Sequence, residues 1–126
     1  MADDGPPAQD PVADGIRLFN EGYFFEAHEV LEDAWHVERG ASRRFLQGLI
    51  QVCAGFHHFQ NGNPSGAVAL LGRGADKIRE YPPDHLGVDA GGLLRDVDAA
   101  RARIEGILRG EESSASVAFP TIRRRA

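Results

Sequence analysis

Residues 15–31 read GIRLFNEGYFFEAHEVL, and residues 55–71 read GFHHFQNGNPSGAVALL. Five positions match at a constant offset of 40, namely Gly15, Phe19, Gly22, Ala27 and Leu31 with Gly55, Phe59, Gly62, Ala67 and Leu71. A repeat of about this length is typical of a helical hairpin that buries its apolar face by stacking on its copy. In each copy we expect the first glycine to allow close helix approach, the second to end a helix at positive φ, and the alanine to lie where two helices nearly touch.

Apolar residues recur at intervals of three and four along the chain, which indicates an all-α domain. Glycine and proline breaks predict five helices, near residues 11–20, 23–38, 43–61, 65–80 and 92–109. The repeat resembles tetratricopeptide hairpins, although those recur at about 34 residues. We predict two stacked antiparallel hairpins with the last helix packed across them as a cap. That helix could instead make a homodimer contact, so monomer and homodimer stay open.

The composition excludes several classes of protein. The chain has 126 residues, 42% of them hydrophobic, and a net charge of −5, which argues against nucleic-acid binding. The single cysteine, Cys53, excludes an internal disulfide and a thiolate zinc cluster, and it suits a reducing compartment. No apolar run approaches the roughly 20 residues of a membrane helix. We therefore expect a soluble cytoplasmic protein that binds neither nucleic acid nor membrane.

Both ends of the chain are polar. Residues 1–10 are rich in Asp, Pro and Ala and lack the apolar centre of a signal peptide, while residues 111–126 end in Arg123, Arg124 and Arg125. We predict two disordered tails around one helical domain at residues 11–110. Because three of the basic residues lie in a tail, the folded part should be more acidic than the total charge suggests.

A line of polar residues runs along the second and third predicted helices. On the second helix, His28 and Glu32 are four residues apart and so share one side of it. The third helix is mostly apolar, but it carries Gln47, Gln51 and His58. Their spacings of four and seven residues place them along a single line of the helix. Antiparallel pairing places the two lines opposite each other, where buried amides and imidazoles must be hydrogen-bonded. We predict a buried polar cluster of His28, Glu32, Gln47, Gln51 and His58.

The same residues resemble the signature of the family known as domain of unknown function 309. That signature is His, three residues, Glu, two residues, Trp, then Arg, three residues, Gln-Gly-Leu-Ile-Gln, and a later His. Here it falls on His28, Glu32, Trp35, Arg43, Gln47, Gly48, Leu49, Ile50, Gln51 and His58. The resemblance runs from about Gly15 to Arg73, and it implies a small all-helical domain with no established activity.

The first two interpretations of the cluster differ in chemistry. It could be a hydrogen-bond network that organises the core by fixing how two helices pair. Alternatively, His28, Glu32 and His58 could bind a divalent zinc or iron ion and support hydrolase or oxidase chemistry. A peptidase is not expected, because Glu32 stands where the metalloprotease signature has its second histidine.

A third interpretation is a small binding module for a small ligand or a protein. Stacked hairpins have a concave side, and Arg43 or Arg44 near its rim could pair with a carboxylate or a phosphate. Glu38 is a nearby acidic partner within the chain. Trp35 could cover a pocket, although at this spacing it is more often part of a core.

Overall fold

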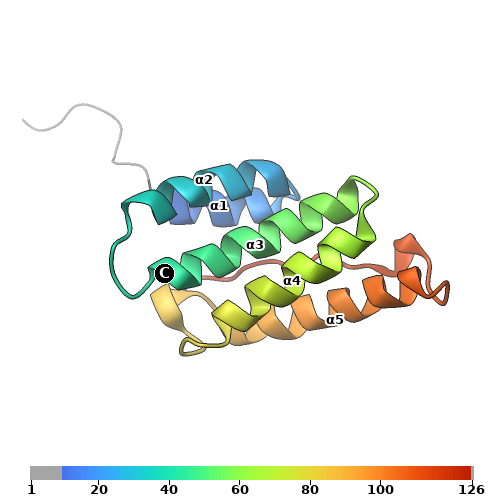
Figure 1. The fold of residues 1–126 in the computed structure, drawn as a ribbon. Helices are drawn as coiled ribbons and strands as arrows, with labels where there is room; N and C mark the ends of the chain where they lie inside the picture. Colours follow the sequence, from blue (N-terminus) through green and yellow to red (C-terminus); the bar gives the residue numbers. More distant parts are fainter. Residues whose placement is uncertain (1–9, 126) are drawn as a thin grey trace, which may run out of the picture.

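The computed structural model describes residues 10–125. Within this range the chain forms five α-helices (Figure 1): α1 (Pro11–Asn20), α2 (Phe24–Val37), α3 (Arg43–Gln60), α4 (Pro64–Ile78) and α5 (Ala90–Leu108). Two short 3-10 helices, η1 (His85–Gly87) and η2 (Ser114–Ser116), flank α5. The all-α prediction is confirmed, and each helix begins and ends within two residues of its predicted bounds. The tail predicted for residues 1–10 lies, except for Asp10, outside the described residues.

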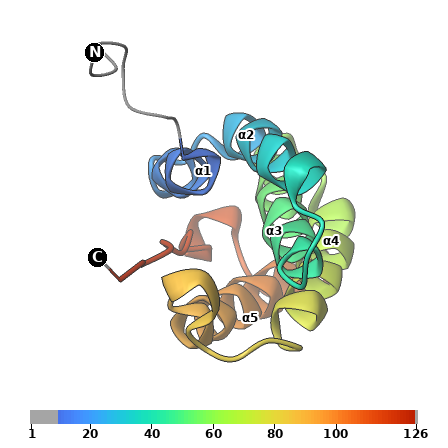
Figure 2. The same ribbon diagram turned by 90° about the vertical axis from the view of Figure 1, so that its left-hand side faces the viewer.

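The helices pack in the order in which they occur in the chain. The main contacts join α1 to α2, α2 to α3, α3 to α4 and α4 to α5. Viewed along the helices, they form an arc with an open side between α1 and α5 (Figure 2). The predicted pair of hairpins is therefore observed, and the arc has a concave inner side. The last helix, expected to pack across the hairpins as a cap, packs mainly on α4 and so covers one end of the arc.

The repeat predicted from the sequence has the same internal geometry in both copies. A Cβ atom placed on Gly15 would lie 2.5 Å from Cγ of Leu31, and one placed on Gly55 would lie 2.9 Å from Cγ of Leu71. Both distances are too short for a real Cβ contact. The first glycine of each copy thus lets the two helices of its hairpin approach closely, as predicted.

The other two small residues of the repeat also have their predicted roles. Gly22 follows α1 with φ of +86°, and Gly62 follows α3 with φ of +76°. This left-handed conformation is accessible to glycine at little cost and ends a helix. Ala27 and Ala67 are completely buried. A larger side chain at either alanine would push the packed helices apart.

The centre of the core is aromatic and joins three helices. Phe24 lies 4.9 Å from Phe19 and 5.2 Å from Phe56, measured between ring centroids. On the other side of α3, α4 crosses at close range, because a Cβ atom on Gly74 would lie 2.6 Å from the main-chain oxygen of Gly48. The helix α3 is therefore in contact with its neighbours on two sides.

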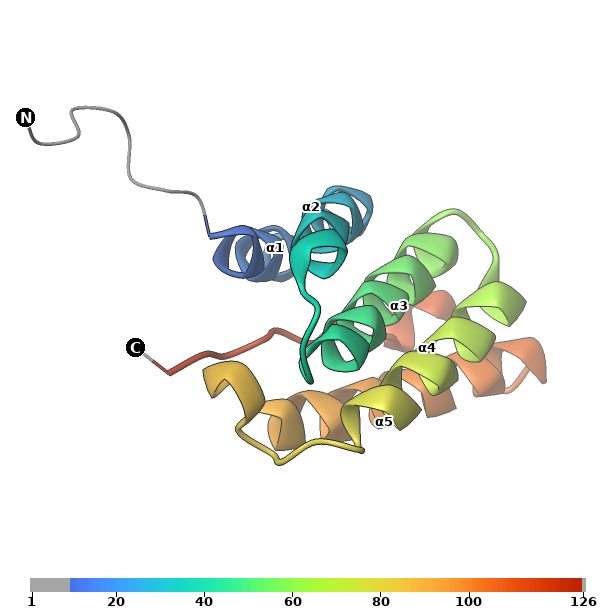
Figure 3. The same cartoon turned by 60° about the vertical axis from the view of Figure 1, so that its left-hand side comes forward.

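Over residues 111–125 the structure differs from the disordered tail predicted for residues 111–126. Residues 117–125, which we call the C-terminal segment, run back in an extended conformation along the inner side of the arc, between α1 and α5 (Figures 2 and 3). Ile122 is only 3% exposed, and Pro120 is buried. A lone extended segment buries its apolar residues without a helical or alternating period, which is why the sequence pattern did not reveal it.

Candidate functional site

The polar line predicted along α2 and α3 is not buried. No polar or charged residue among those described is buried, and all five predicted members are half-buried. At 100° per residue, Gln47, Gln51 and His58 lie on the side of α3 opposite Phe45 and Phe56, which face the core. The core is organised by aromatic and aliphatic residues, so the prediction of a buried polar cluster is wrong.

The members of the line have separate partners. The His28 Nε2 atom lies 3.3 Å from Glu32 Oε1, as expected for residues four apart on one helix. Gln51 has its partner on another helix, because its Oε1 accepts a hydrogen bond of 2.8 Å from Lys77 Nζ on α4. The predicted network is thus divided: His28 pairs with Glu32 within α2, whereas Gln51 pairs with α4.

Trp35 and Arg43 form a pair at the connection between α2 and α3. The guanidinium carbon of Arg43 lies 3.7 Å from the centroid of the Trp35 ring, and Arg43 Nε donates to the Trp35 main-chain oxygen at 3.3 Å. Trp35 itself is half-buried against the core. Glu38 accepts from the main-chain nitrogen of Gly40 at 2.8 Å. The contacts of Arg43 therefore tie the ends of two helices together.

Arg44, the other arginine expected at the rim, has an acidic partner within the chain. Its guanidinium donates to both carboxylate oxygens of Glu80, with distances of 2.8 to 3.0 Å. This pairing satisfies the charge at the start of α3 and leaves no reason to assign Arg44 to an external anion.

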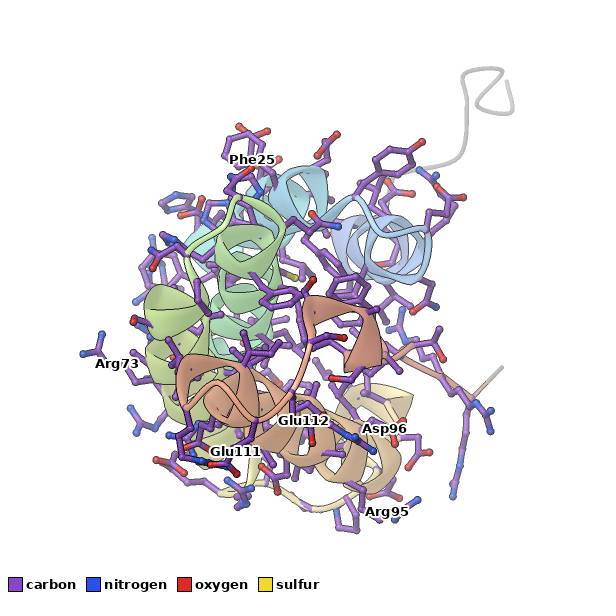
Figure 4. All side chains as sticks on the ribbon, turned by 90° about the vertical axis from the view of Figure 1, so that its right-hand side faces the viewer. Phe25, Arg73, Arg95, Asp96, Glu111 and Glu112 are labelled. Carbon is purple, nitrogen blue, oxygen red and sulfur yellow. The ribbon has the colours of Figure 1, made fainter. Side chains whose placement is uncertain are left out.

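His28 and His58 do approach the same small cavity, of about 190 Å³, together with Phe25, Ala54 and His57. Phe25 projects from α2 at the outer edge of the molecule (Figure 4) and is 45% exposed. The Nδ1 atom of His28 is buried without a hydrogen-bond partner. The cavity is mostly apolar, so it offers little to a charged ligand.

The predicted metal site of His28, Glu32 and His58 is not formed. Among residues 10–125, no three His, Cys, Asp or Glu side chains are placed to hold a metal ion. Asn63 explains part of this result: its Oδ1 caps α4 by accepting from Gly66, so its Nδ2 donates to His58 Nδ1 at 3.0 Å. The Nδ1 atom of His58 is thus engaged in a hydrogen bond within the chain.

On the inner side of the arc, the main chain of the C-terminal segment is hydrogen-bonded along both of its edges. Asn20, at the end of α1, donates from Nδ2 to the Ile122 oxygen at 2.9 Å and accepts from the Ile122 nitrogen at 2.6 Å. On the opposite edge of the segment, the Asp89 nitrogen donates to the Arg123 oxygen and the Arg125 nitrogen donates to the Gly87 oxygen, both at 2.8 Å. These bonds frame an antiparallel bridge between Val88 and Arg124. The segment is thus held by a single antiparallel bridge and by the amide of Asn20.

Two apolar side chains anchor the C-terminal segment. Phe119 contacts Phe24 and Phe56 with ring centroids 5.2 and 5.5 Å apart, and it remains 40% exposed. Ile122, three residues later, is buried against the helical core. Together, the inner side of the arc and residues 87–89 form a groove, which we call the inner groove.

Comparisons with known proteins place the helical hairpins in a family. Residues 12–70 match the family described as Domain of unknown function (DUF309). This chain carries a DUF309 domain. The "Uncharacterized protein YpuF" of Bacillus subtilis (strain 168) is 32% identical over 90 residues, which cover 67% of this chain and 50% of that protein. An "Uncharacterized protein" of Aquifex aeolicus (strain VF5) is 26% identical over 95 residues, which cover 75% of this chain and 26% of that protein.

This chain matches about half the length of the first relative and about a quarter of the second. The family match covers α1 to α3 and the first half of α4, and it ends before the loop and the C-terminal segment. The inner groove is therefore built from the DUF309 hairpins on one side and from residues outside the match on the other. No helix within residues 10–125 has the length and apolar character to cross a membrane.

The loop before α5 gives the inner groove its strained edge. Leu86 has φ of +56°, in the left-handed region that non-glycine residues adopt at a cost of roughly 1–2 kcal/mol. The main-chain oxygen of Leu86 accepts from Arg124 Nε at 3.2 Å, and the next oxygen, of Gly87, accepts from Arg125. The strained turn thus presents two successive carbonyl groups to the segment.

Charged groups meet at the end of the inner groove next to α1. Arg124 Nη1 lies 3.2 Å from Asp10 Oδ2. A hydrogen bond from the main-chain nitrogen of Ala13, aided by Arg124, holds the pKa of Asp10 below its usual value. The carboxylate is therefore charged at neutral pH and available to a cation.

Sequence reasoning missed the residues that make these contacts. Asn20, Phe119 and Ile122 lie far apart in the chain, and no local pattern links them. One signal was present: Asn20 and Gln60 occupy matching positions of the repeat. Both are carboxamides at the end of a helix, and both bond to a main chain, since Gln60 Nε2 donates to the Gly22 oxygen at 3.2 Å.

Proposed function

We propose that the DUF309 domain of this chain is a small binding module whose inner groove takes an extended peptide segment of a protein partner. One observation carries the proposal: the side-chain amide of Asn20 bonds both main-chain polar groups of Ile122. Such a contact holds any extended chain, because it does not depend on the side chain of the bound residue. In this molecule the C-terminal segment takes the place of the partner.

The mode of binding is strand addition. The segment pairs with residues 87–89 through main-chain hydrogen bonds, and its side chains Phe119 and Ile122 pack against the helical core. Peptide-binding domains commonly combine main-chain bonds, which give affinity, with pockets, which give specificity. Cavities of about 340 and 210 Å³ border the segment at Phe119 and Thr121, so the inner groove has space for larger side chains.

Cys53 is buried, and a lone cysteine suits a reducing compartment, so we place the binding in the cytoplasm. The core-network interpretation has less support, since the polar line is half-buried and divided, and the metal interpretation lacks a ligand set among residues 10–125.

The test uses the full chain with its own segment released. A Phe119→Ser/Ile122→Ser variant, here the released variant, removes both anchors, and an Ala118→Ser/Thr121→Ser variant is its matched control because both positions are exposed. Fluorescence anisotropy measures binding of a labelled peptide with the native sequence of residues 114–125. We expect the released variant to bind at least tenfold more tightly than wild type or the control, because the tethered segment competes at an effective concentration of about 1 mM.

Adding Asn20→Ala to the released variant should weaken binding about tenfold, since two hydrogen bonds of roughly 0.5–1.5 kcal/mol each are lost. A released variant with the helical circular dichroism of wild type and no gain in peptide binding would overturn the proposed function.

A second measurement avoids any change to the anchors. A protease site inserted between Ser113 and Ser114 lets the segment be cut from the folded, otherwise native chain. After cleavage, the fragment should exchange with the labelled peptide on dilution. A fragment that never exchanges would show that the segment is a permanent part of the core and would also overturn the proposed function.

A further inference from the structure

We infer that the partner segment is basic, with two apolar anchors three positions apart followed directly by a basic run that has arginine at its second position. This inference rests on the proposed function and names the class of peptide that the inner groove takes. It is carried by the charges around Arg123, Arg124 and Arg125 and by the geometry of Arg124.

Acidic side chains surround the end of the inner groove. Asp84 and Asp89 share a cavity of about 500 Å³ with the three arginines. Asp89 and Asp96 line a second cavity, of about 210 Å³, together with Arg95 of α5 and Arg123 of the segment. Figure 4 shows Asp96 on α5. Asp10 approaches from α1 and contacts Arg124. Asp10 thus pairs directly with Arg124, and the other three aspartates line the cavities beside the arginines.

The net negative charge of the chain also favours a positively charged partner. It has 19 acidic and 14 basic side chains, and three of the basic ones are those in the C-terminal segment. When the segment leaves, the inner groove loses three arginines and keeps Asp10, Asp84, Asp89 and Asp96 with Arg95 as the remaining cation. A positively charged replacement restores the balance, and long-range attraction speeds its association.

Arg124 has a geometry that lysine cannot reproduce. Its Nε donates to the Leu86 oxygen at 3.2 Å, while its Nη1 lies 3.2 Å from Asp10 Oδ2. A planar guanidinium bonds two acceptors in different directions at once, whereas an ammonium group is a single point charge. The left-handed conformation of Leu86 aims its carbonyl group at this position. The inner groove therefore distinguishes arginine from lysine two residues after the second anchor.

The experiment compares labelled peptides on the released variant. The native peptide of residues 114–125 is tested beside an Arg124→Lys peptide and a peptide with all three arginines replaced by serine. We expect losses in affinity of about 3- to 10-fold for Arg124→Lys and more than tenfold for the triple replacement. Affinity for the native peptide should fall steeply between 50 and 300 mM salt, and affinity for the serine peptide should not.

Variants of the domain test the acidic side. Asp10→Asn and Asp89→Asn keep the helix caps that these residues provide, because asparagine caps as well as aspartate does. Each should weaken binding of the native peptide and leave binding of the serine peptide unchanged. Asp33→Asn, at an exposed position on α2, is the matched control and should change neither.

The outcomes separate this inference from the proposed function. Equal affinities for the native, lysine and serine peptides would overturn the basic partner and leave peptide binding intact. Loss with the serine peptide but not with the lysine peptide would overturn the arginine preference. Failure of every peptide to bind would overturn the proposed function itself.

Discussion

Replacing Ile122 by alanine measures how firmly the C-terminal segment is docked. The substitution removes three carbon atoms from a side chain that is 3% exposed and leaves the Asn20 bonds to the main chain in place. At about 0.8 kcal/mol per buried carbon, the transfer contribution is about 2.4 kcal/mol, and incomplete relaxation of the pocket adds to it. The segment can detach, so the loss cannot exceed its docking free energy. We expect unfolding to become easier by about 2–3 kcal/mol.

Thermal unfolding followed by circular dichroism checks the value. For a chain of this size, about 2–3 kcal/mol corresponds to a decrease in Tm of roughly 6–15 °C. Under native conditions, trypsin should cleave at Arg123–Arg125 about 30- to 100-fold faster, because the open form is more populated. Thr121→Ala, at an exposed position, is the control and should lie within about 0.5 kcal/mol of wild type. A Tm for Ile122→Ala equal to that of the control would refute the docked segment.

Three further predictions concern the helices. Gly74→Ala places a Cβ atom 2.6 Å from a main-chain oxygen of α3, so urea titrations should show a loss of stability of about 1–3 kcal/mol. Gly91→Ala is the control, because the nearest atom to its Cβ is 3.6 Å away, and it should be neutral or stabilising. Arg44→Ala breaks an exposed pair with Glu80 and should leave the urea midpoint close to that of wild type, with an even smaller effect in 1 M salt; a large loss of stability would contradict the exposed geometry. Burial raises the pKa of the Cys53 thiol, so its labelling by a thiol reagent should be slow and should track unfolding as denaturant is added; rapid labelling of the native chain would contradict this.

The features that sequence could predict are those set by local geometry. Gly15 and Gly22 have their roles because helix approach and helix ending depend on a few neighbouring residues, and the same holds for their copies at an offset of 40. Helical periodicity also placed His28 beside Glu32. The prediction that the polar line is buried was wrong. Helical periodicity shows which face of α3 carries Gln51, but it does not show which faces of α3 the other helices cover.

The inner groove depended on contacts that no local pattern contains. Asn20 and Ile122 are separated by 102 positions, and the segment that includes Ile122 has no regular period. Its polar ending and small residues resemble a flexible tail. Only the arc of helices, with its open side, gives such a segment a place to bind.

The position of the C-terminal segment has a mechanical consequence. The helices at the two ends of the arc, α1 and α5, each pack mainly on one neighbour, and the segment joins them across the open side through Asn20 and Asp89. It therefore acts as a tie that sets the curvature of the whole arc. Release should let the α1–α2 hairpin swing away from α5 and increase the radius of gyration seen by small-angle X-ray scattering. The overall shape of the molecule would then depend on whether the inner groove is occupied.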